Sequence, residues 1–298
     1  MRDLRLPILP ALNRWLPIIG TLATALAVTG CGTVRIAYNN APSLTYWWVD
    51  AYVDLDSEQS SRVRADLQTI QNWHRKDEMP LITQQIASLR TRALAPTTPE
   101  QICEAVADFQ LRLHALVERT APTLAAVAPT LTENQLQHLD KEFAKRNAEW
   151  SREHLQIAPA ERLENSIKLL VERTESFYGK LSESQRALVR ANTLVSDFDG
   201  ETVYREKIRR HQDALQTLAQ MRSTPSTPAQ LRAAALGVLQ RALVSPDARY
   251  RQYLARVTQQ GCANIAALHN SASPAQRAKL AETLREYEDD LRTLSAPS

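Results

Sequence analysis

Apolar residues recur along most of the chain at intervals of three and four positions, the spacing of one face of an α-helix. The clearest case lies near the C-terminus, where the pattern runs through Leu280, Leu284, Tyr287, Leu291 and Leu294. Such a pattern is typical of the seam of a packed antiparallel helix. The sequence has no runs of alternating β-branched residues, which would predict strands. The hydrophobic pattern therefore predicts an all-α protein.

One short motif marks six of the predicted helix starts. A Ser, Thr or Asp is followed three positions later by Gln, as in a capping box. There the first side chain binds an amide of the first turn and the Gln side chain reaches back to the cap. In three of the motifs a proline takes the first helical position, where its missing N–H costs no bond. The six pairs are Asp56–Gln59, Thr98–Gln101, Thr132–Gln135, Ser182–Gln185, Thr227–Gln230 and Ser273–Gln276.

The spacing of these caps leaves two architectures open. HEAT-like solenoid repeats have a period of about 40–47 residues, so a repeat array is one alternative. The intervals between the caps are uneven, however, and the helix bodies do not resemble one another. The sequence therefore favours an irregular multi-helix bundle of antiparallel helices.

Other residues place the breaks between helices. Ser245 before Pro246 predicts a further helix start, and Pro80 predicts a kink or restart in the helix that begins at Asp56. We also expect breaks near residues 95–99, 121–130, 179–182, 197–200, 223–228 and 271–274.

Residues 1–30 have the pattern of a secretion signal. A basic start is followed by an apolar centre from Trp15 to Val28, which is shorter than the ~20 residues that span a bilayer. The next residues complete the sequence Val28-Thr29-Gly30-Cys31, which resembles the lipobox of bacterial lipoproteins. The resemblance implies cleavage after Gly30 and fatty acylation of Cys31, palmitate included.

Three segments follow from this interpretation. We expect a lipoprotein signal peptide over residues 1–30, a lipidated N-terminus and tether over 31–43, and a helical periplasmic domain over 44–298. Gly32 stands where an Asp would resemble the retention signal of the inner membrane. The expected location is therefore the cell envelope, anchored in the outer membrane and facing the periplasm, with an envelope protein as the expected partner.

Charge and cysteine content narrow the chemistry. The formal net charge is only +3, so we expect no nucleic-acid partner, which would require a strongly basic face. Beyond Cys31 the chain has two cysteines, Cys103 and Cys262. An oxidising compartment favours a disulfide between them, and the alternative is two separate buried thiols.

No motif predicts a catalytic residue, a metal site or a cofactor. The six histidines form neither His-x-x-x-His nor Glu-x-x-His, and no Gly-x-Ser-x-Gly or glycine-rich phosphate loop is present. Two acidic clusters, Asp54–Asp56–Glu58 and Asp197–Asp199–Glu201, resemble incomplete calcium loops, but helix caps and turns explain them better. A basic run over residues 204–213 is interpreted as a solvated helix face paired with nearby acids, with anionic lipid or glycan as the alternative.

The aromatic segment near the N-terminus has two interpretations. Tyr46, Trp47, Trp48 and Tyr52 belong to a helix too apolar all round to stand alone. In the interpretation we favour, they fill the core of the bundle. In the alternative, they contact lipid headgroups or a partner protein, because both settings suit amphipathic aromatic side chains.

Two resemblances bear on function. The stretch from Cys31 to Gln59, "NWHRKDEMP" (72–80), "LTENQ" (131–135) and "LSESQ" (181–185) together resemble a family of uncharacterised helical proteobacterial lipoproteins with no assigned activity. The Leu-Thr-x-x-Gln motif at Leu131 and, more loosely, Leu181 is also similar to periplasmic stress chaperones of the Spy and CpxP kind. We expect a non-enzymatic adaptor or assembly protein; a chaperone-like binder and an envelope hydrolase using dispersed carboxylates are the alternatives.

Overall fold

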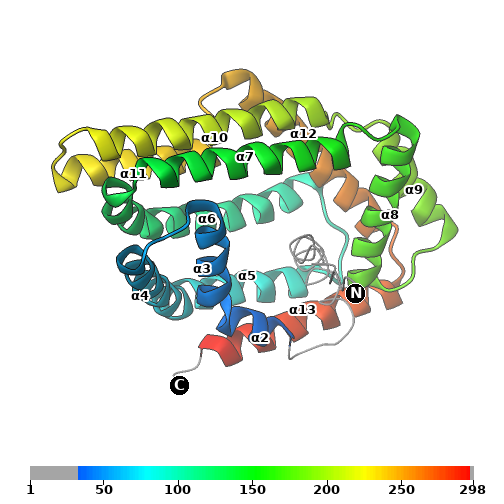
Figure 1. Cartoon of the computed structure of the whole chain (residues 1–298). Coiled ribbons are helices and arrows are strands. Elements are labelled where there is room, and N and C mark those ends of the chain that lie inside the picture. Colours follow the sequence, from blue (N-terminus) through cyan, green and yellow to red (C-terminus); the bar gives the residue numbers. More distant parts are fainter. Residues whose placement is uncertain (1–32, 296–298) are drawn as a thin grey trace, which may run out of the picture.

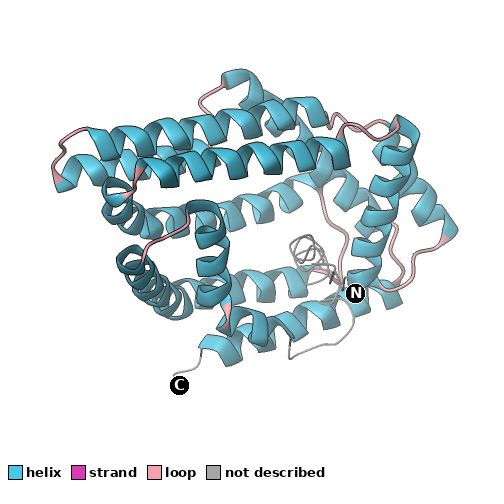
Figure 2. Cartoon of the chain, in the orientation of Figure 1, coloured by secondary structure: helices cyan, strands magenta, loops and turns pink. Residues whose placement is uncertain are grey.

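The computed structural model describes residues 33–295, so the predicted signal peptide and Cys31 lie outside the described part. Every regular element in these residues is a helix (Figure 2), which confirms the all-α prediction. A π-helical turn, His74–Glu78, joins α4 to α5, and a 3₁₀ turn, Ala128–Thr130, follows α6. The α-helices are α2 (Thr33–Asn39), α3 (Ala41–Val53), α4 (Ser57–Trp73), α5 (Met79–Arg92), α6 (Pro99–Val127), α7 (Glu133–His154), α8 (Pro159–Tyr178), α9 (Glu183–Leu194), α10 (Gly200–Ser223), α11 (Pro228–Leu243), α12 (Ala248–Asn270) and α13 (Pro274–Ser295).

The helices pack as an irregular bundle and do not stack as a solenoid (Figure 1). α7 and α10 lie side by side along one edge, and α6 packs against α11 and α12. α5 and α13 pair along the opposite edge. α8 and α9 form one end of the molecule, and α3 and α4 form the other. The preference for a bundle over a repeat array is confirmed.

Two apolar clusters hold the bundle together. The larger joins α3, α4, α6, α7, α10 and α11, with fully buried side chains such as Ala128 and Ala235 at its centre. The smaller joins α8 and α9 through Ile167, Val171 and Val189. Burial of apolar surface at about 25 cal/mol per Å² is the main force that stabilises such contacts.

The capping boxes form as the sequence predicts. In each of the six motifs the side-chain oxygen of the Gln accepts the backbone N–H of its own cap residue. The side chain of the cap residue in turn accepts the backbone N–H of the Gln. Tertiary structure adds a feature that the motif alone does not contain, because four of the six glutamines meet in pairs.

The first pair joins the starts of α4 and α7. The Gln135 side-chain amide donates to Gln59 Oε1 at 2.6 Å and to the Asp54 carbonyl at 2.8 Å. The Gln59 amide donates to Gln135 Oε1 at 3.3 Å and to the Thr130 carbonyl at 3.1 Å. Each glutamine side chain therefore forms hydrogen bonds both at the start of its own helix and with the backbone just before the other helix.

The second pair repeats this arrangement at the starts of α9 and α13. The Gln185 and Gln276 side chains exchange amide hydrogen bonds of 2.9 Å, and they also donate to the Ser271 and Lys180 carbonyls respectively. In both pairs the accepting carbonyl lies two residues before the opposite cap. The motif thus fixes tertiary contacts as well as helix starts, and we call these two sites the paired caps.

The paired caps give a testable stability difference. Gln135→Ala is expected to lower the free energy of unfolding by about 2–3 kcal/mol, because it removes the Gln half of a capping box, the buried hydrogen bonds to Gln59 and the donor to the Asp54 carbonyl. The matched control is Gln230→Ala, since Gln230 is exposed and bonds only within its own cap; a loss near 1 kcal/mol is expected there. Urea denaturation followed by circular dichroism measures both, and equal losses would contradict the tertiary role.

Some predicted boundaries are wrong. α6 continues through Pro122 to Val127, so the break expected over 121–130 is confined to its end. A proline within a helix costs about 3 kcal/mol, and the close burial of Ala121 and Ala128 on the core offsets that cost. The helix predicted to begin at Ser245 is capped instead by Asp247, whose carboxylate accepts the Arg249 N–H. The break between α7 and α8 carries no capping box, and the sequence did not reveal it.

The segment assigned to a tether also differs. Thr33–Asn39 forms α2, which bends into α3 at Asn40 and packs against α13 (Figure 1). Arg35 pairs with the buried Asp290 at 3.2 Å. The Gln71 amide donates to the Tyr38 carbonyl at 2.6 Å, and the Tyr38 hydroxyl bonds His74 Nδ1 at 3.0 Å. These contacts dock the segment on the body, which an extended tether would not do.

Candidate functional site

The aromatic segment divides between core and surface. Tyr46 is buried, bonds Ser60 Oγ at 3.0 Å and belongs to the larger apolar cluster, and Tyr52 packs on that cluster. Trp47 and Trp48 are instead 57% and 56% exposed. The core interpretation is therefore correct for the tyrosines and wrong for the tryptophans, because a helix packed on α4 and α7 presents only one side to them.

A row of rings leads inward from the exposed tryptophans. The Trp48 ring lies 4.9 Å from the Tyr52 ring, and the Tyr52 ring lies 5.8 Å from that of Phe143. Phe143 stacks nearly parallel on His211, with the ring centroids 3.9 Å apart. The row therefore connects the surface of α3 to the contact between α7 and α10.

His211, at the inner end of this row, predicts an effect of pH on stability. Burial, aided by the charge of Lys207, lowers the pKa of His211 to about 4, whereas its ordinary value is 6.5. The unfolded chain therefore binds this proton at a higher pH than the folded chain does. The contribution of neutral His211 to the free energy of unfolding is expected to be fully present above about pH 6.5 and to fall progressively as the pH drops toward 4.

The effect is checked by NMR titration of the imidazole together with denaturation at pH 7 and pH 5. His211→Phe keeps a ring for stacking and removes the titration, so it should flatten the difference between the two pH values. An imidazole that titrates near 6.5 in the folded protein would contradict the expectation.

Other titratable groups stabilise the fold. His269 is buried and contacts the Tyr178 hydroxyl at 2.9 Å and the Ala95 carbonyl at 2.8 Å. Asp56 and Asp199 cap α4 and α10, so both acidic clusters mark helix starts. Among residues 33–295 no group of three or more His, Cys, Asp or Glu side chains is placed to hold a metal ion.

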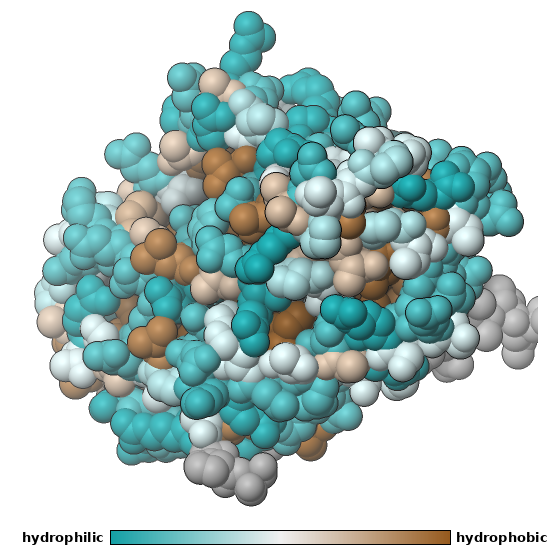
Figure 3. Space-filling model, turned by 90° about the vertical axis from the view of Figure 1, so that its left-hand side faces the viewer, coloured by the Kyte–Doolittle hydropathy of each residue, from teal (hydrophilic) through white to brown (hydrophobic). Residues whose placement is uncertain are grey.

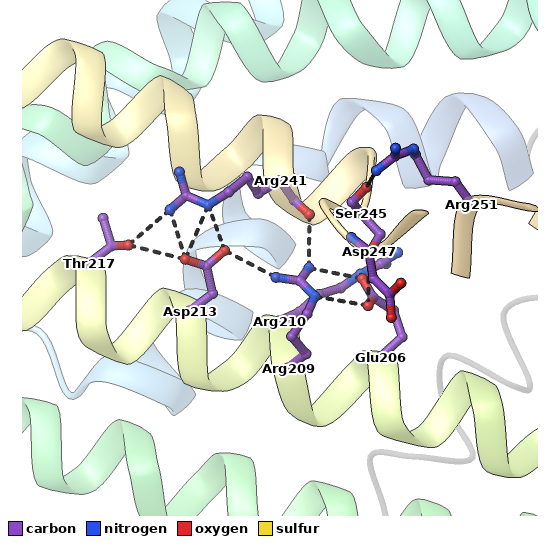
Figure 4. A network of polar contacts seen from close by, with 9 residues as sticks. All are labelled: Glu206, Arg209, Arg210, Asp213, Thr217, Arg241, Ser245, Asp247 and Arg251. Atoms are coloured by element: carbon purple, nitrogen blue, oxygen red, sulfur yellow. Dashed lines mark hydrogen bonds and ion pairs between the residues drawn. The ribbon is translucent and has the colours of Figure 1, made fainter. Parts of the chain in front are cut away.

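Arg209 and Arg210 of the basic run over 204–213 belong to a partly buried ion-pair network between α10 and α11 (Figure 4). Glu206 is only 5% exposed, and it accepts hydrogen bonds from Arg209, Arg210 and Ser245. Asp213 binds Arg241 of α11 through bonds of 2.7–3.2 Å. Pairing with nearby acids was expected, but the network joins α10 to α11 and to the loop before α12 and is not a solvated face.

Burial and pairing act in opposite directions on these acids. Burial raises the pKa of Glu206, but the hydrogen bonds from Arg209, Arg210 and Ser245 outweigh it and hold the pKa below its ordinary value. The hydrogen bond from Arg241 chiefly lowers the pKa of Asp213. Both carboxylates therefore remain ionised at neutral pH and act as structural anions.

Cys103 and Cys262 are joined in a disulfide, the pairing that the sequence favours. The bond links α6 to α12 across 159 residues of chain, and Cys262 is almost completely buried. The alternative of two separate thiols does not describe this structure.

An open groove that no sequence motif indicates lies between α5 and α6. It has a volume of about 220 Å³, and two of its lining side chains, Leu81 and Phe109, are 41% and 37% exposed. Leu89 and Ala105 continue the apolar lining, and Arg92, Asp108 and Arg112 add charge. We call this site the α5–α6 groove. A mixed apolar and charged groove between two helices suits the side chains of an amphipathic segment.

The side of the molecule with α3 and α4 has small apolar patches on a largely hydrophilic surface (Figure 3). Figure 3 shows the side of the molecule with α3 and α4, where brown apolar groups are separated by teal hydrophilic ones. None of the helices within residues 33–295 is both long and apolar enough to cross a bilayer.

The protein is a helical bundle stabilised by the paired caps, a disulfide and buried ion pairs. The chain belongs to the family of unknown function DUF6279, whose match covers residues 51–251. The expected resemblance to an uncharacterised family is confirmed to that extent. The match begins after Trp48 and ends before Cys262. No curated protein and no solved structure matches the chain.

Proposed function

We propose that the protein is a lipid-anchored, periplasm-facing adaptor or assembly protein of the cell envelope, held through Cys31 and acting by protein–protein contact. The observation that supports it is the α5–α6 groove, where Leu81 and Phe109 stay exposed between two helices that are otherwise packed. Exposed aromatic and aliphatic side chains beside an arginine are characteristic of interaction sites. The outer membrane is the proposed location, because Gly32 stands where the inner-membrane retention signal would have Asp.

Two polar atoms of the residues that line the groove are enclosed and carry no hydrogen bond. Arg112 pairs with the buried Glu78 at 3.4 Å, but its Nε has no hydrogen-bond partner and is shielded from solvent. The same is true of Gln85 Oε1, which belongs to another lining residue. The charged groups that a partner can reach in the groove are instead the exposed Arg92 and Asp108 side chains.

The glutamines on which the resemblance to chaperones depends are buried in this structure. Gln135 and Gln185 of the Leu-Thr-x-x-Gln-like motifs are 7% and 4% exposed and are used in the paired caps. A client protein would not reach them in the folded state.

Photo-crosslinking in cells tests the adaptor proposal. A photoreactive residue replaces Leu81 in the groove or, as matched control, Leu254 on α12; both leucines are 41% exposed. We expect a discrete, reproducible adduct with one envelope protein from position 81 and none from position 254. Equal labelling at both positions, or no adduct from 81, would reject the groove as the contact site. Suppressed aggregation of a model client by the mature protein would favour the chaperone instead.

A further inference from the structure

The N-terminal end of the described residues lies very close to the proposed anchor. Only two peptide units separate Cys31 from Thr33, the first residue of α2, so the two Cα atoms are at most about 7 Å apart. α2 is in turn fastened to the body through Arg35, Tyr38 and Asn39. An acyl group on Cys31 would therefore hold the bilayer against one particular side of the bundle.

The exposed face of α3 lies a short distance along the chain from the start of α2. Leu44, Trp47 and Trp48 recur at three- and four-residue spacing and are 42%, 57% and 56% exposed. At 1.5 Å per helical residue, the path from Thr33 to Trp47 is about 21 Å at most, so the tryptophans lie within about 30 Å of Cys31. Tryptophan concentrates at the headgroup level of membranes, where its ring is apolar and its N–H stays hydrated.

Two arginines contact the segment from Asn39 to Tyr46, on the side of α3 that packs on α4. The Arg64 guanidinium lies over the Tyr46 ring, 3.4 Å from its centroid, and Arg64 is exposed on α4. Arg75 donates to Asn39 at the junction of α2 and α3. Cationic side chains at a membrane surface are attracted to anionic lipids by roughly 1 kcal/mol each.

The acidic residues of the segment lie toward the far end of α3. Asp50 accepts the Leu55 N–H through its carboxylate, and Asp54 ends the helix in a left-handed conformation. They follow Trp48 in the chain, on the side away from Cys31. Asp50 lies one helical turn after Trp47, so its charge borders the face formed by Leu44, Trp47 and Trp48 at the end away from Cys31.

We propose that this face of α3 rests in the headgroup region of the membrane that carries the anchor, and that it fixes the orientation of the bundle on the bilayer. The inference rests on the proposed lipidation of Cys31. It leaves the α5–α6 groove, which belongs to other helices, as the site for a protein partner.

Tryptophan fluorescence tests the inference on the mature, full-length protein purified from membranes. The protein is placed in vesicles of phosphatidylethanolamine and phosphatidylglycerol, with and without brominated acyl chains that quench nearby indoles. Besides Trp47 and Trp48, only Trp73 and Trp150 remain after removal of the signal. We expect clear quenching in the unmodified protein and at least a twofold smaller quenched fraction in Trp47→Phe/Trp48→Phe. In the matched control Trp73→Phe/Trp150→Phe the quenched fraction should be at least as large as in the unmodified protein, because the emission of the two distant tryptophans is gone.

The outcomes separate this inference from the proposed function. Quenching that the Trp47→Phe/Trp48→Phe variant leaves unchanged would overturn the membrane contact. The same holds if Trp47 and Trp48 are shielded from both brominated lipid and aqueous acrylamide, because a protein would then cover the face. Mass spectrometry of the N-terminal peptide reports the acylation of Cys31. An acylated protein without quenching rejects only the inference, whereas an unacylated one rejects the anchor and the inference together.

Discussion

Replacing Cys103 and Cys262 together by alanine is expected to lower the free energy of unfolding by about 2–5 kcal/mol, the largest single effect we predict. The bond closes a loop of 159 residues, and a long closed loop removes much conformational freedom from the unfolded chain. It also joins α6 to α12, so its loss separates the N-terminal and C-terminal helices in the unfolded state.

Urea denaturation of the oxidised protein, the reduced protein and the double variant measures the effect. The reduced protein and the variant should have similar midpoints, both below that of the oxidised protein. Alanine is chosen because Cys262 is only 2% exposed, and a serine hydroxyl there would add a desolvation cost of its own. Three coincident midpoints would show that the bond contributes nothing to stability.

Glu206→Gln is expected to lower the free energy of unfolding by about 3 kcal/mol. Removing one partner of a buried ion pair leaves the others uncompensated; here Arg210 loses Glu206 as its anion, and Arg209 keeps only Asp213. The arginines are partly exposed, which keeps the expected loss at the lower end of the range for buried pairs. The exposed Glu201 on the same helix is the matched control, and Glu201→Gln should change stability by less than about 0.5 kcal/mol.

The same variant has a pH signature. The pKa of Glu206 is lower in the folded protein than its ordinary value of 4.5. Its stabilising contribution is therefore present above about pH 4.5 and is lost as the pH falls through the folded-state pKa. Denaturation at pH 7 and pH 3.5 should show a smaller acid-induced loss in Glu206→Gln than in the unmodified protein. An equal loss in both would contradict the assignment of Glu206 as an ionised structural group.

The sequence predicted local structure well because helix starts are decided by neighbouring residues. A capping box needs only four consecutive residues, so Thr132 and Gln135 can be recognised without knowledge of what lies around them. The period of the apolar positions likewise predicted helices throughout. The errors arose where distant groups intervene: burial keeps α6 helical through Pro122, and the α10 network engages Ser245.

The candidate surfaces were harder to predict. Composition alone grouped Trp47 and Trp48 with Tyr46, because all are aromatic and adjacent. Which of them faces solvent depends on the side from which α4 and α7 approach, and local pattern does not report it. The α5–α6 groove has no motif at all, because it arises from incomplete contact between two helices.

The amino-acid sequence by itself determined the helical class, the six capped helix starts and the favoured pairing of Cys103 with Cys262. Only the tertiary structure decided that Gln59 meets Gln135, that Glu206 becomes a buried anion, and that Trp47 and Trp48 stay outside. The physical reason is range: caps and periodicity act over a few residues of one helix. Burial and pairing depend instead on side chains that lie far apart in the chain and meet only when the helices pack.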